Sequence, residues 1–157
     1  MWKKIEKMIR VLFVCLGNIC RSPMAEFIFK DMVKKQGIED EFFIKSAATS
    51  YEAVGEDIYE PAKEKLTQKN IPFEKRKAVR IRKEDYSKYD YILAMEEANI
   101  RNIKRIVGED TENKIYKLLD FSENPRDIAD PWYTGNFEIA YNDIVEGCEG
   151  FLKFLGK

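Results

Sequence analysis

The segment CLGNICRS, residues 15–22, brings a thiol, an arginine and a hydroxyl close together in the chain. Cys15 follows an apolar run, and Pro23, directly after Ser22, is typical of the first turn of a helix. A loop that curls into a helix N-terminus directs backbone N–H groups inward, at the positive end of the helix dipole, and this geometry suits a tetrahedral anion. We therefore expect residues 15–22 to bind an oxyanion such as phosphate, sulfate or vanadate.

Cys15 is the candidate nucleophile of this loop. A free cysteine has a pKa of about 8.5, and helix N-termini and nearby cations lower that pKa by up to several units. Arg21 supplies such a cation, and its planar fork can pair two oxygens of one phosphoryl group. We therefore expect Cys15 to be a thiolate at neutral pH. The alternative is a small buried residue at a strand end beside a surface arginine.

The sequence contains no histidine, which removes the commonest general base and the commonest metal ligand. An enzyme that attacks a phosphate ester through Cys15 must protonate the departing oxygen, so a carboxylic acid is the expected donor. We favour Asp130, because Pro131 stiffens its backbone and Trp132 and Tyr133 offer aromatic walls.

Other roles are open for the carboxylates of this region. Asp127 lies in the same loop as Asp130 and could be the donor, and Asp120, nearer the preceding strand, could be a structural cap. Asp130 itself could simply stabilise a turn, which is the commoner role of a loop aspartate.

Cysteine content, chain length and net charge exclude several classes of protein. Three cysteines, Cys15, Cys20 and Cys148, are too few and too scattered for a disulfide framework or a zinc site, so we expect neither metal nor cofactor. The 157 residues, 45% of them apolar, fit one domain over residues 1–157 with a lead-in at residues 1–8. A formal charge of −1 predicts no nucleic-acid partner and no stable membrane association, and the lack of a signal-peptide pattern predicts a cytoplasmic protein.

Apolar runs typical of strands alternate with helical patterns along the chain. We expect strands at residues 9–14, 42–45, 89–95 and 115–119, and helices at 22–35, 61–69, 99–107 and 137–155. This alternation predicts an α/β doubly wound fold with a parallel sheet and helices on both faces. Ligands bind at the carboxyl ends of such strands, so the loops at 15–22 and 121–135 should meet there.

Two motifs resemble those of one family. The segment CLGNICRSP, residues 15–23, resembles the phosphate-binding loop of the low-molecular-weight protein tyrosine phosphatases, and DPWY, residues 130–133, resembles their acid loop. Residues 46–50 and 90–95 resemble further family segments in the same order. The resemblance implies a four-stranded sheet of order 2-1-3-4. It also implies hydrolysis of protein phosphotyrosine and small aryl phosphates through a phosphocysteine intermediate.

The resemblance implies a role for each matching residue. Cys15 is the nucleophile, Arg21 holds the phosphoryl oxygens, and Asp130 is the acid and later the base. Ser22 donates a hydrogen bond to the Cys15 sulfur, and Asn18, with Ser46 as its partner, holds the shape of the loop. Cys20 can form a reversible disulfide with Cys15. The residues expected to contact the substrate are Leu16, Gly17, Asn18, Ile19, Cys20, Ser22, Tyr51, Trp132 and Tyr133.

The sequence departs from the family pattern at three positions. Arg76 stands where the family commonly has a histidine that contacts the loop asparagine, so Asn18 needs another partner. Tyr51 lies one position before the usual rim aromatic, whose place Glu52 takes, and Glu96 replaces the usual aspartate.

Three alternative functions fit the sequence less well. Arsenate reductases with a similar loop need a further redox cysteine pair, and only Cys148 follows here. Protein-arginine phosphatases resemble the same loop but have Thr where Ile19 stands, and an apolar side chain there favours an aromatic ester. A non-catalytic phosphotyrosine-binding protein would have no use for Cys15 as nucleophile or Asp130 as acid.

Overall fold

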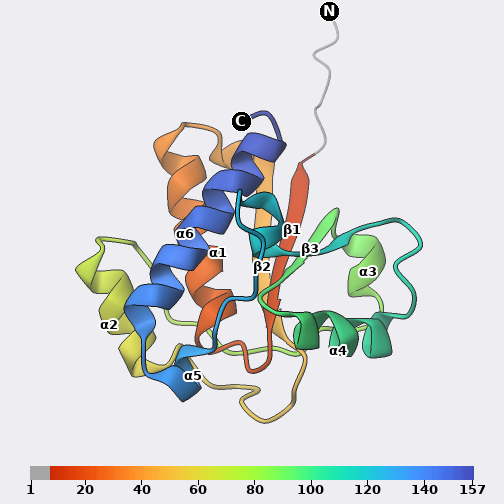
Figure 1. Cartoon of the computed structure of the whole chain (residues 1–157), viewed down its shortest axis with the longest axis horizontal. Helices are drawn as coiled ribbons and strands as arrows, with labels where there is room; N and C mark the ends of the chain where they lie inside the picture. The colour runs from red at the N-terminus through yellow and green to blue at the C-terminus, as the bar shows by residue number, and fades with distance from the viewer. Residues whose placement is uncertain (1–7) are drawn as a thin grey trace, which may run out of the picture.

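The structure, a computed structural model, describes residues 8–157, so the expected lead-in lies, except for Met8, outside the described residues. In chain order its elements are β1 (Ile9–Cys15), α1 (Arg21–Lys35), η1 (Glu39–Glu41), β2 (Phe42–Ala48), α2 (Glu60–Gln68), α3 (Asp85–Lys88), β3 (Tyr91–Ala94), α4 (Glu97–Val107), β4 (Ile115–Lys117), η2 (Leu118–Phe121), α5 (Pro131–Thr134) and α6 (Phe137–Phe154). Figure 1 shows the strands at the centre with helices to either side.

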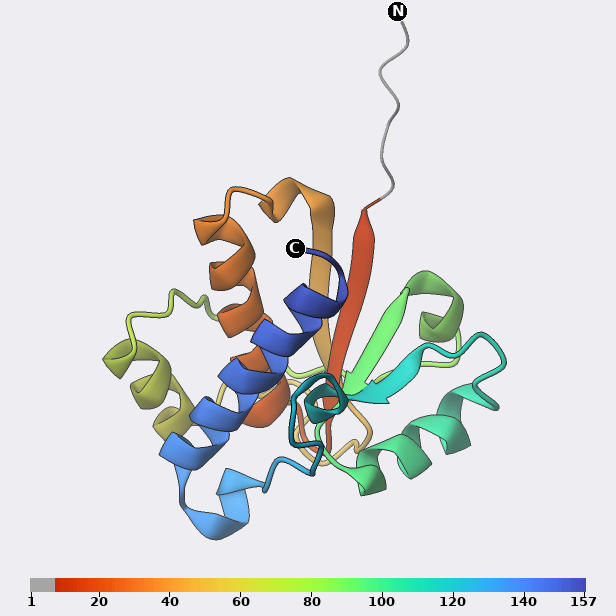
Figure 2. The same ribbon diagram turned by 45° about the horizontal axis from the view of Figure 1, so that its top comes forward.

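The four strands form one parallel sheet in the order β2-β1-β3-β4, which confirms the predicted fold class and strand order. β1 is central and pairs with β2 from Ile9↔Phe42 to Cys15↔Ala48. It pairs with β3 over a shorter register that ends at Val14↔Ala94. The carboxyl ends of β1 and β3 therefore lie at one edge of the sheet, from which the loop after β2 and the α5 segment also extend (Figures 1 and 2).

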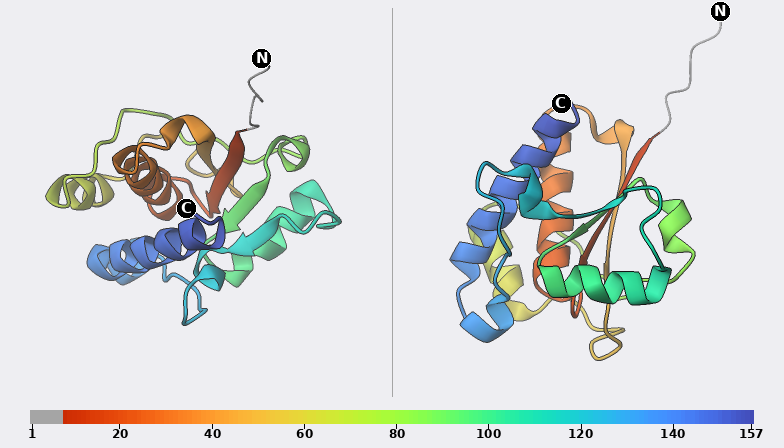
Figure 3. Two further views of the ribbon diagram at one scale, coloured as in Figure 1. Left: turned by 90° about the horizontal axis from the view of Figure 1, so that it is seen from above. Right: turned by 45° about the vertical axis from the view of Figure 1, so that its right-hand side comes forward.

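Helices cover both faces of the sheet, as Figure 3 shows from two sides. α1 and α6 pack on one face, where Phe13, Phe29 and Phe151 lie fully buried in the larger apolar cluster. α4 packs on the other face, where Ile103 joins Ile92 in a second buried cluster. No helix within residues 8–157 has the length and apolar character that crossing a bilayer requires.

Several elements differ from the sequence-based expectation, each for a local reason. β2 continues past Lys45, the expected end of the strand, to Ala48, so Ser46 lies within the strand. β4 ends at Lys117, because the next two residues, both buried leucines, belong to the short helix η2. The backbone N–H of Lys117 donates to the carboxylate of Asp120 at 2.9 Å, so Asp120 is the structural cap considered above.

Candidate functional site

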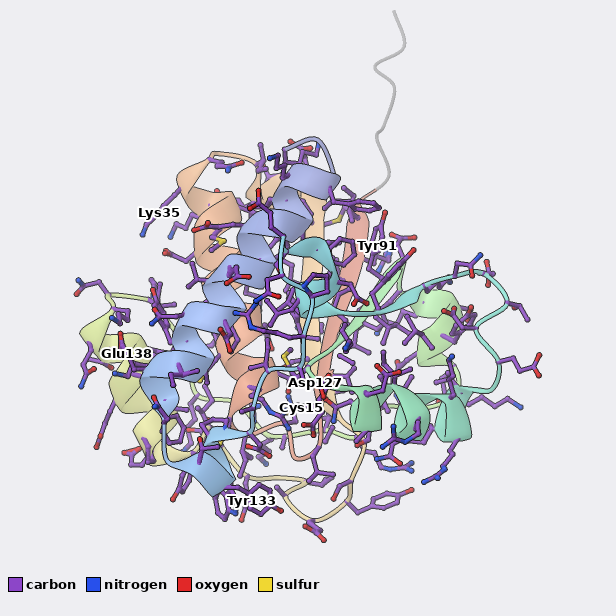
Figure 4. All side chains as sticks on the ribbon, in the orientation of Figure 1. Cys15, Lys35, Tyr91, Asp127, Tyr133 and Glu138 are labelled. Carbon is purple, nitrogen blue, oxygen red and sulfur yellow. The ribbon has the colours of Figure 1, made fainter. Side chains whose placement is uncertain are left out.

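The two loops expected to meet do meet, at the carboxyl end of β1. They border a cavity of about 210 Å³. It is lined by Cys15, Leu16, Gly17, Ile19, Cys20, Arg21, Ser50, Glu52, Ala53, Glu56, Asp130, Trp132 and Tyr133. Figure 4 shows Cys15 at the lower end of the sheet and Tyr133 beyond it, on α5.

The Cys15 sulfur lies at the base of this cavity between two polar groups. Its Sγ is 3.0 Å from the Ser22 hydroxyl, and it accepts a hydrogen bond from the backbone N–H of Asn18 at 3.3 Å. The Ser22 oxygen accepts from the Asn18 side-chain amide at 2.8 Å, which leaves its own proton free to point at the sulfur. α1 starts with no side-chain cap and no acidic residue in its first turn, so its own first turn leaves the N-terminal N–H groups open to an anion.

Asn18 is the residue that bends the loop. It has a φ of 58°, whereas neighbouring Gly17 has an ordinary φ, so the left-handed turn falls on the asparagine. Its amide donates to Ser46 at 2.9 Å, and its side-chain oxygen accepts from the backbone N–H of Val79 at 3.2 Å. The buried side chain is therefore bonded on every side, which explains how a strained backbone conformation is held.

Arg76, which stands where the family commonly has a histidine, is itself a partner of Asn18. Its guanidinium donates to the backbone carbonyl of Asn18 and, at 3.1 Å, to the carbonyl of Glu56. The first contact holds the loop that carries Cys15, and the second holds the loop that forms the opposite wall of the cavity. Burial lowers the pKa of Arg76, partly offset by negative charge at Glu26, Asp57 and Cys15.

Arg21 is almost fully buried and is held by three residues from two other segments of the chain. It donates to the carbonyl of Ile128 at 2.8 Å and lies 3.2 Å from Asp130 and 3.4 Å from Glu96. Burial opposes its charge, but negative charge at Cys15, Asp130 and Glu96 outweighs burial and raises the pKa of Arg21. Its Nε is buried and has no partner within residues 8–157, so an oxyanion in the cavity could satisfy it.

Asp130 faces Arg21 and also starts the short helix α5. One carboxylate oxygen accepts from the backbone N–H of Trp132 at 3.1 Å, and the other is the one that pairs with Arg21. Asp130 therefore lines the cavity and caps a helix at once. Asp127, the alternative acid, instead pairs with Lys117 at 3.1 Å and does not line the cavity.

Aromatic residues form part of the entrance, though not all those expected. Trp132 and Tyr133 line the cavity and are largely exposed, and the Trp132 ring lies 4.5 Å from that of Tyr59. Tyr51 does not line this cavity, because its ring turns away to stack on Arg80, with 4.1 Å between guanidinium and ring centre.

Several residues of the site were not expected from the sequence. Ser50, Glu52, Ala53 and Glu56 form one wall, and the backbone of Ile128 holds Arg21. The Ser46 hydroxyl donates to buried Glu26 at 2.6 Å, which extends the Asn18 network into α1. Ser46 and Ser50 belong to the segment 46–50 that resembles the family, and Glu52 takes the place of the rim aromatic, but the roles of these residues in the site depend on contacts between distant segments.

The other cysteines lie in different surroundings. Cys20 lines the cavity, and burial with nearby negative charge raises its pKa to about 12. Cys148 is fully buried in the core on α6, where it does not line the cavity. Within residues 8–157, no cluster of cysteine and carboxylate side chains could hold a metal ion.

Comparison with known proteins gives consistent matches over nearly the whole chain. Residues 10–157 match the family described as low molecular weight phosphotyrosine protein phosphatase. The chain is 41% identical to YfkJ of Bacillus subtilis, covering 96% of this chain and 97% of that one, and 38% identical to PtpA of Staphylococcus aureus, covering 96% of each; both are described as low molecular weight protein-tyrosine-phosphatases.

Solved structures agree with these sequence matches. The crystal structure of YfkJ from Bacillus subtilis superposes with a TM-score of 0.91 at 40% identity, covering 96% of each chain. That of DARP, a Drosophila arginine phosphatase, superposes with a TM-score of 0.85 at 31% identity, covering 94% of this chain and 98% of that one.

Proposed function

The chain belongs to the low molecular weight protein tyrosine phosphatase family, and we propose that it hydrolyses protein phosphotyrosine and small aryl phosphates through a phosphocysteine intermediate. The observation that carries this proposal is the placement of one sulfur, one buried guanidinium and one carboxylate around a single cavity. Each of the three has a distinct part in transferring a phosphoryl group.

In the first step, the Cys15 sulfur attacks phosphorus as the bond to the phenolic oxygen breaks. Arg21 and the backbone N–H groups of the loop hold the three non-bridging oxygens, with the buried Nε of Arg21 as one donor. The Ser22 hydroxyl, 3.0 Å from the sulfur, stabilises its negative charge both before attack and when the sulfur later departs.

Asp130 completes both steps by moving protons. It gives its proton to the departing phenolate oxygen, and in the second step it accepts a proton from the water that attacks phosphorus. The phosphorus–sulfur bond then breaks and inorganic phosphate leaves. Asp130 lies 3.2 Å from Arg21, so a phosphoryl group held by Arg21 would lie beside the acid, and this position supports the role.

The walls of the cavity favour an aromatic ester. Ile19, Trp132 and Tyr133 line it, so a flat ring could be enclosed between apolar surfaces. Because one structural relative is described as an arginine phosphatase, phosphoarginine is the comparison substrate. We expect the apolar side chain of Ile19 to favour the aryl ester over it.

The proposal is tested with purified protein and an aryl phosphate in the presence of a chelator. The parent protein should turn the ester over, and Cys15→Ser should abolish turnover while its unfolding midpoint stays close to that of the parent. Undiminished hydrolysis by Cys15→Ser would contradict the proposed nucleophile. Faster turnover of phosphoarginine than of the aryl ester would contradict the substrate class.

The role of Asp130 is tested by varying the leaving group. Asp130→Asn should slow esters of weakly acidic phenols much more than esters of strongly acidic phenols, because only the former need a proton as they depart. Asp127→Asn is the matched control from the same loop and should not show this difference. Equal losses for both kinds of ester in Asp130→Asn would remove Asp130 from the role of acid.

A further inference from the structure

A second concavity, here called the basic groove, adjoins the phosphate cavity. Its volume is about 500 Å³, and it lies between the end of β2, the segment after residue 78 and α3. The basic groove is lined by Leu12, Lys45, Ser46, Ala47, Tyr51, Val54, Val79, Arg80, Arg82, Asp85, Lys88 and Tyr89.

The two concavities share residues 50–56 as a common wall. In Figure 1 this stretch is part of the yellow loop beyond the end of β2. Ser50, Glu52, Ala53 and Glu56 face the phosphate cavity, whereas Tyr51 and Val54 face the basic groove. A bound peptide that crosses this wall would therefore pass from one concavity into the other.

The charges of the two concavities are opposite. Four cations and a single carboxylate, Asp85, line the basic groove. Around the phosphate cavity, one cation, Arg21, faces Glu52, Glu56 and Asp130. Because the formal net charge of the chain is only −1, this separation of charge is a local property of the two concavities and not of the whole surface.

Three of the groove cations, Lys45, Arg80 and Lys88, form no ion pair with any carboxylate in residues 8–157. The ammonium groups of Lys45 and Lys88 lie 5.6 Å and 5.7 Å from the centre of the Phe43 ring. The Arg10 guanidinium lies over the same ring at 5.1 Å, so three positive groups are gathered over one aromatic side chain. Of these, Lys45 and Lys88 line the basic groove and remain open to an anionic partner.

Arg80 is held in place before any partner arrives. Its Nε donates to the carbonyl of Thr49 at 3.1 Å, another nitrogen donates to the Tyr51 hydroxyl at 3.1 Å, and the guanidinium stacks on the Tyr51 ring. A guanidinium that is already ordered loses little conformational freedom when it pairs with a carboxylate. Tyr51 thus orients a cation of the basic groove rather than lining the phosphate cavity.

We propose that the basic groove binds an acidic segment of the phosphoprotein substrate, on the far side of residues 50–56 from the phosphotyrosine. This inference rests on the proposed function. Glu52 and Glu56 disfavour acidic residues directly beside the phosphotyrosine, whereas the groove attracts those further along. The preferred carboxylates are therefore separated along the peptide from the phosphotyrosine by the residues that cross the wall at 50–56. The concave shape of the groove suits a chain segment. A flat membrane would instead be bound by cations that project from a convex surface.

The experiment compares kcat/KM for phosphotyrosine peptides that carry a Glu-Glu pair at increasing distance from the phosphotyrosine, on either side, in an otherwise neutral sequence. For the parent protein, kcat/KM should be higher for the peptide with the Glu-Glu pair at one particular spacing than for the neutral peptide. In the double variant Lys45→Glu/Lys88→Glu, kcat/KM for that peptide should fall roughly threefold to tenfold, with the neutral peptide and an aryl phosphate little changed. The preference should also weaken as salt rises.

Matched variants separate local charge from net charge and from misfolding. Lys34→Glu/Lys153→Glu makes the same change at two exposed lysines of α1 and α6, on the opposite face of the sheet, and should keep the preference. If the charge-reversed double variant does not fold, Lys45→Gln/Lys88→Gln removes the two charges and should still reduce the preference.

Failure of this inference is distinct from failure of the proposed function. If neither the aryl phosphate nor any phosphotyrosine peptide is hydrolysed, the proposed function is wrong. If these substrates are hydrolysed but acidic peptides gain nothing, or gain equally in the Lys45/Lys88 variants, the docking site is wrong. Binding of anionic vesicles that is lost in the same variants, without any peptide preference, would assign the groove to a membrane instead.

Discussion

Replacing Arg76 with alanine tests how the phosphate loop is held in shape. Arg76 connects the Asn18 carbonyl to the Glu56 carbonyl, and so joins the loop that carries Cys15 to the opposite wall of the cavity. Asn18 is 1% exposed, so its carbonyl would lose its charged donor in a place that water reaches poorly. The left-handed backbone of Asn18 would then relax.

The size of the effect follows from these contacts. A hydrogen bond from a charged donor contributes about 1.5–3 kcal/mol, and a buried acceptor left unpaired costs about 1–3 kcal/mol. Because Arg76 is only partly buried, we expect its removal to cost about 1.4–2.8 kcal/mol of the energy that holds the loop in its catalytic shape. A loss of this size in transition-state stabilisation corresponds to a fall of about 10- to 100-fold in kcat/KM. Inhibition by vanadate should weaken in parallel, since the same loop binds it.

The assay measures kcat/KM for an aryl phosphate, the inhibition constant for vanadate and the free energy of unfolding in urea. Arg76→Lys keeps the charge but lacks the fork that reaches two carbonyls, so its loss should be intermediate. Lys77→Ala removes one exposed charge next in sequence and should leave both constants close to those of the parent. Parental kcat/KM and vanadate inhibition in Arg76→Ala would refute the reasoning.

Three further predictions concern stability and oxidation. Gly150→Ala should destabilise the protein by about 1–3 kcal/mol in urea unfolding although alanine favours helices, because the added carbon would overlap the backbone carbonyl of Phe121. Burial alone would raise the pKa of Asp57, but hydrogen bonds from a lysine and two backbone N–H groups outweigh it and lower that pKa to about 2. A carboxyl group whose pKa is lowered by folding stabilises the protein at pH values above its unfolded pKa, and this stabilisation is lost as the pH falls through the folded pKa. Between about pH 4 and pH 2, the free energy of unfolding of Asp57→Asn should therefore fall by about 1–2 kcal/mol less than that of the parent. Burial raises the pKa of Cys20 to about 12 and keeps it a thiol at neutral pH, so mild peroxide should act first at Cys15 and then yield a Cys15–Cys20 disulfide, detected by mass spectrometry and reversed by a thiol reductant.

Each of these has its own control. Glu149→Ala, at an exposed position beside Gly150, should not destabilise α6, and equal effects of the two changes would contradict the close-contact argument. Parallel acid-unfolding curves for the parent and Asp57→Asn would show that Asp57 is not stabilising. Inactivation by peroxide without a disulfide, in the parent as in Cys20→Ser, would leave Cys20 with a packing role alone.

Much of the fold could be predicted from the sequence because its signals are local. The strand at residues 9–14, the helix that follows Pro23 and the long apolar face of the last helix depend on periodicity within one segment. Strands that alternate with helices favour a parallel sheet, whereas the order 2-1-3-4 came from the family resemblance. The short helices α3 and α5 were missed, since four residues are too few to show a helical period.

The sequence by itself determined the character of the phosphate loop, because Cys15, Arg21 and the helix start lie within a few residues of one another. Only the tertiary structure decided which groups surround it. Arg76 reaches Asn18 across 58 residues of chain, and Arg21 reaches Asp130 across 109. It also decided that Tyr51 turns to the basic groove, since side-chain direction depends on packing between distant segments, and periodicity along a single segment does not encode that packing.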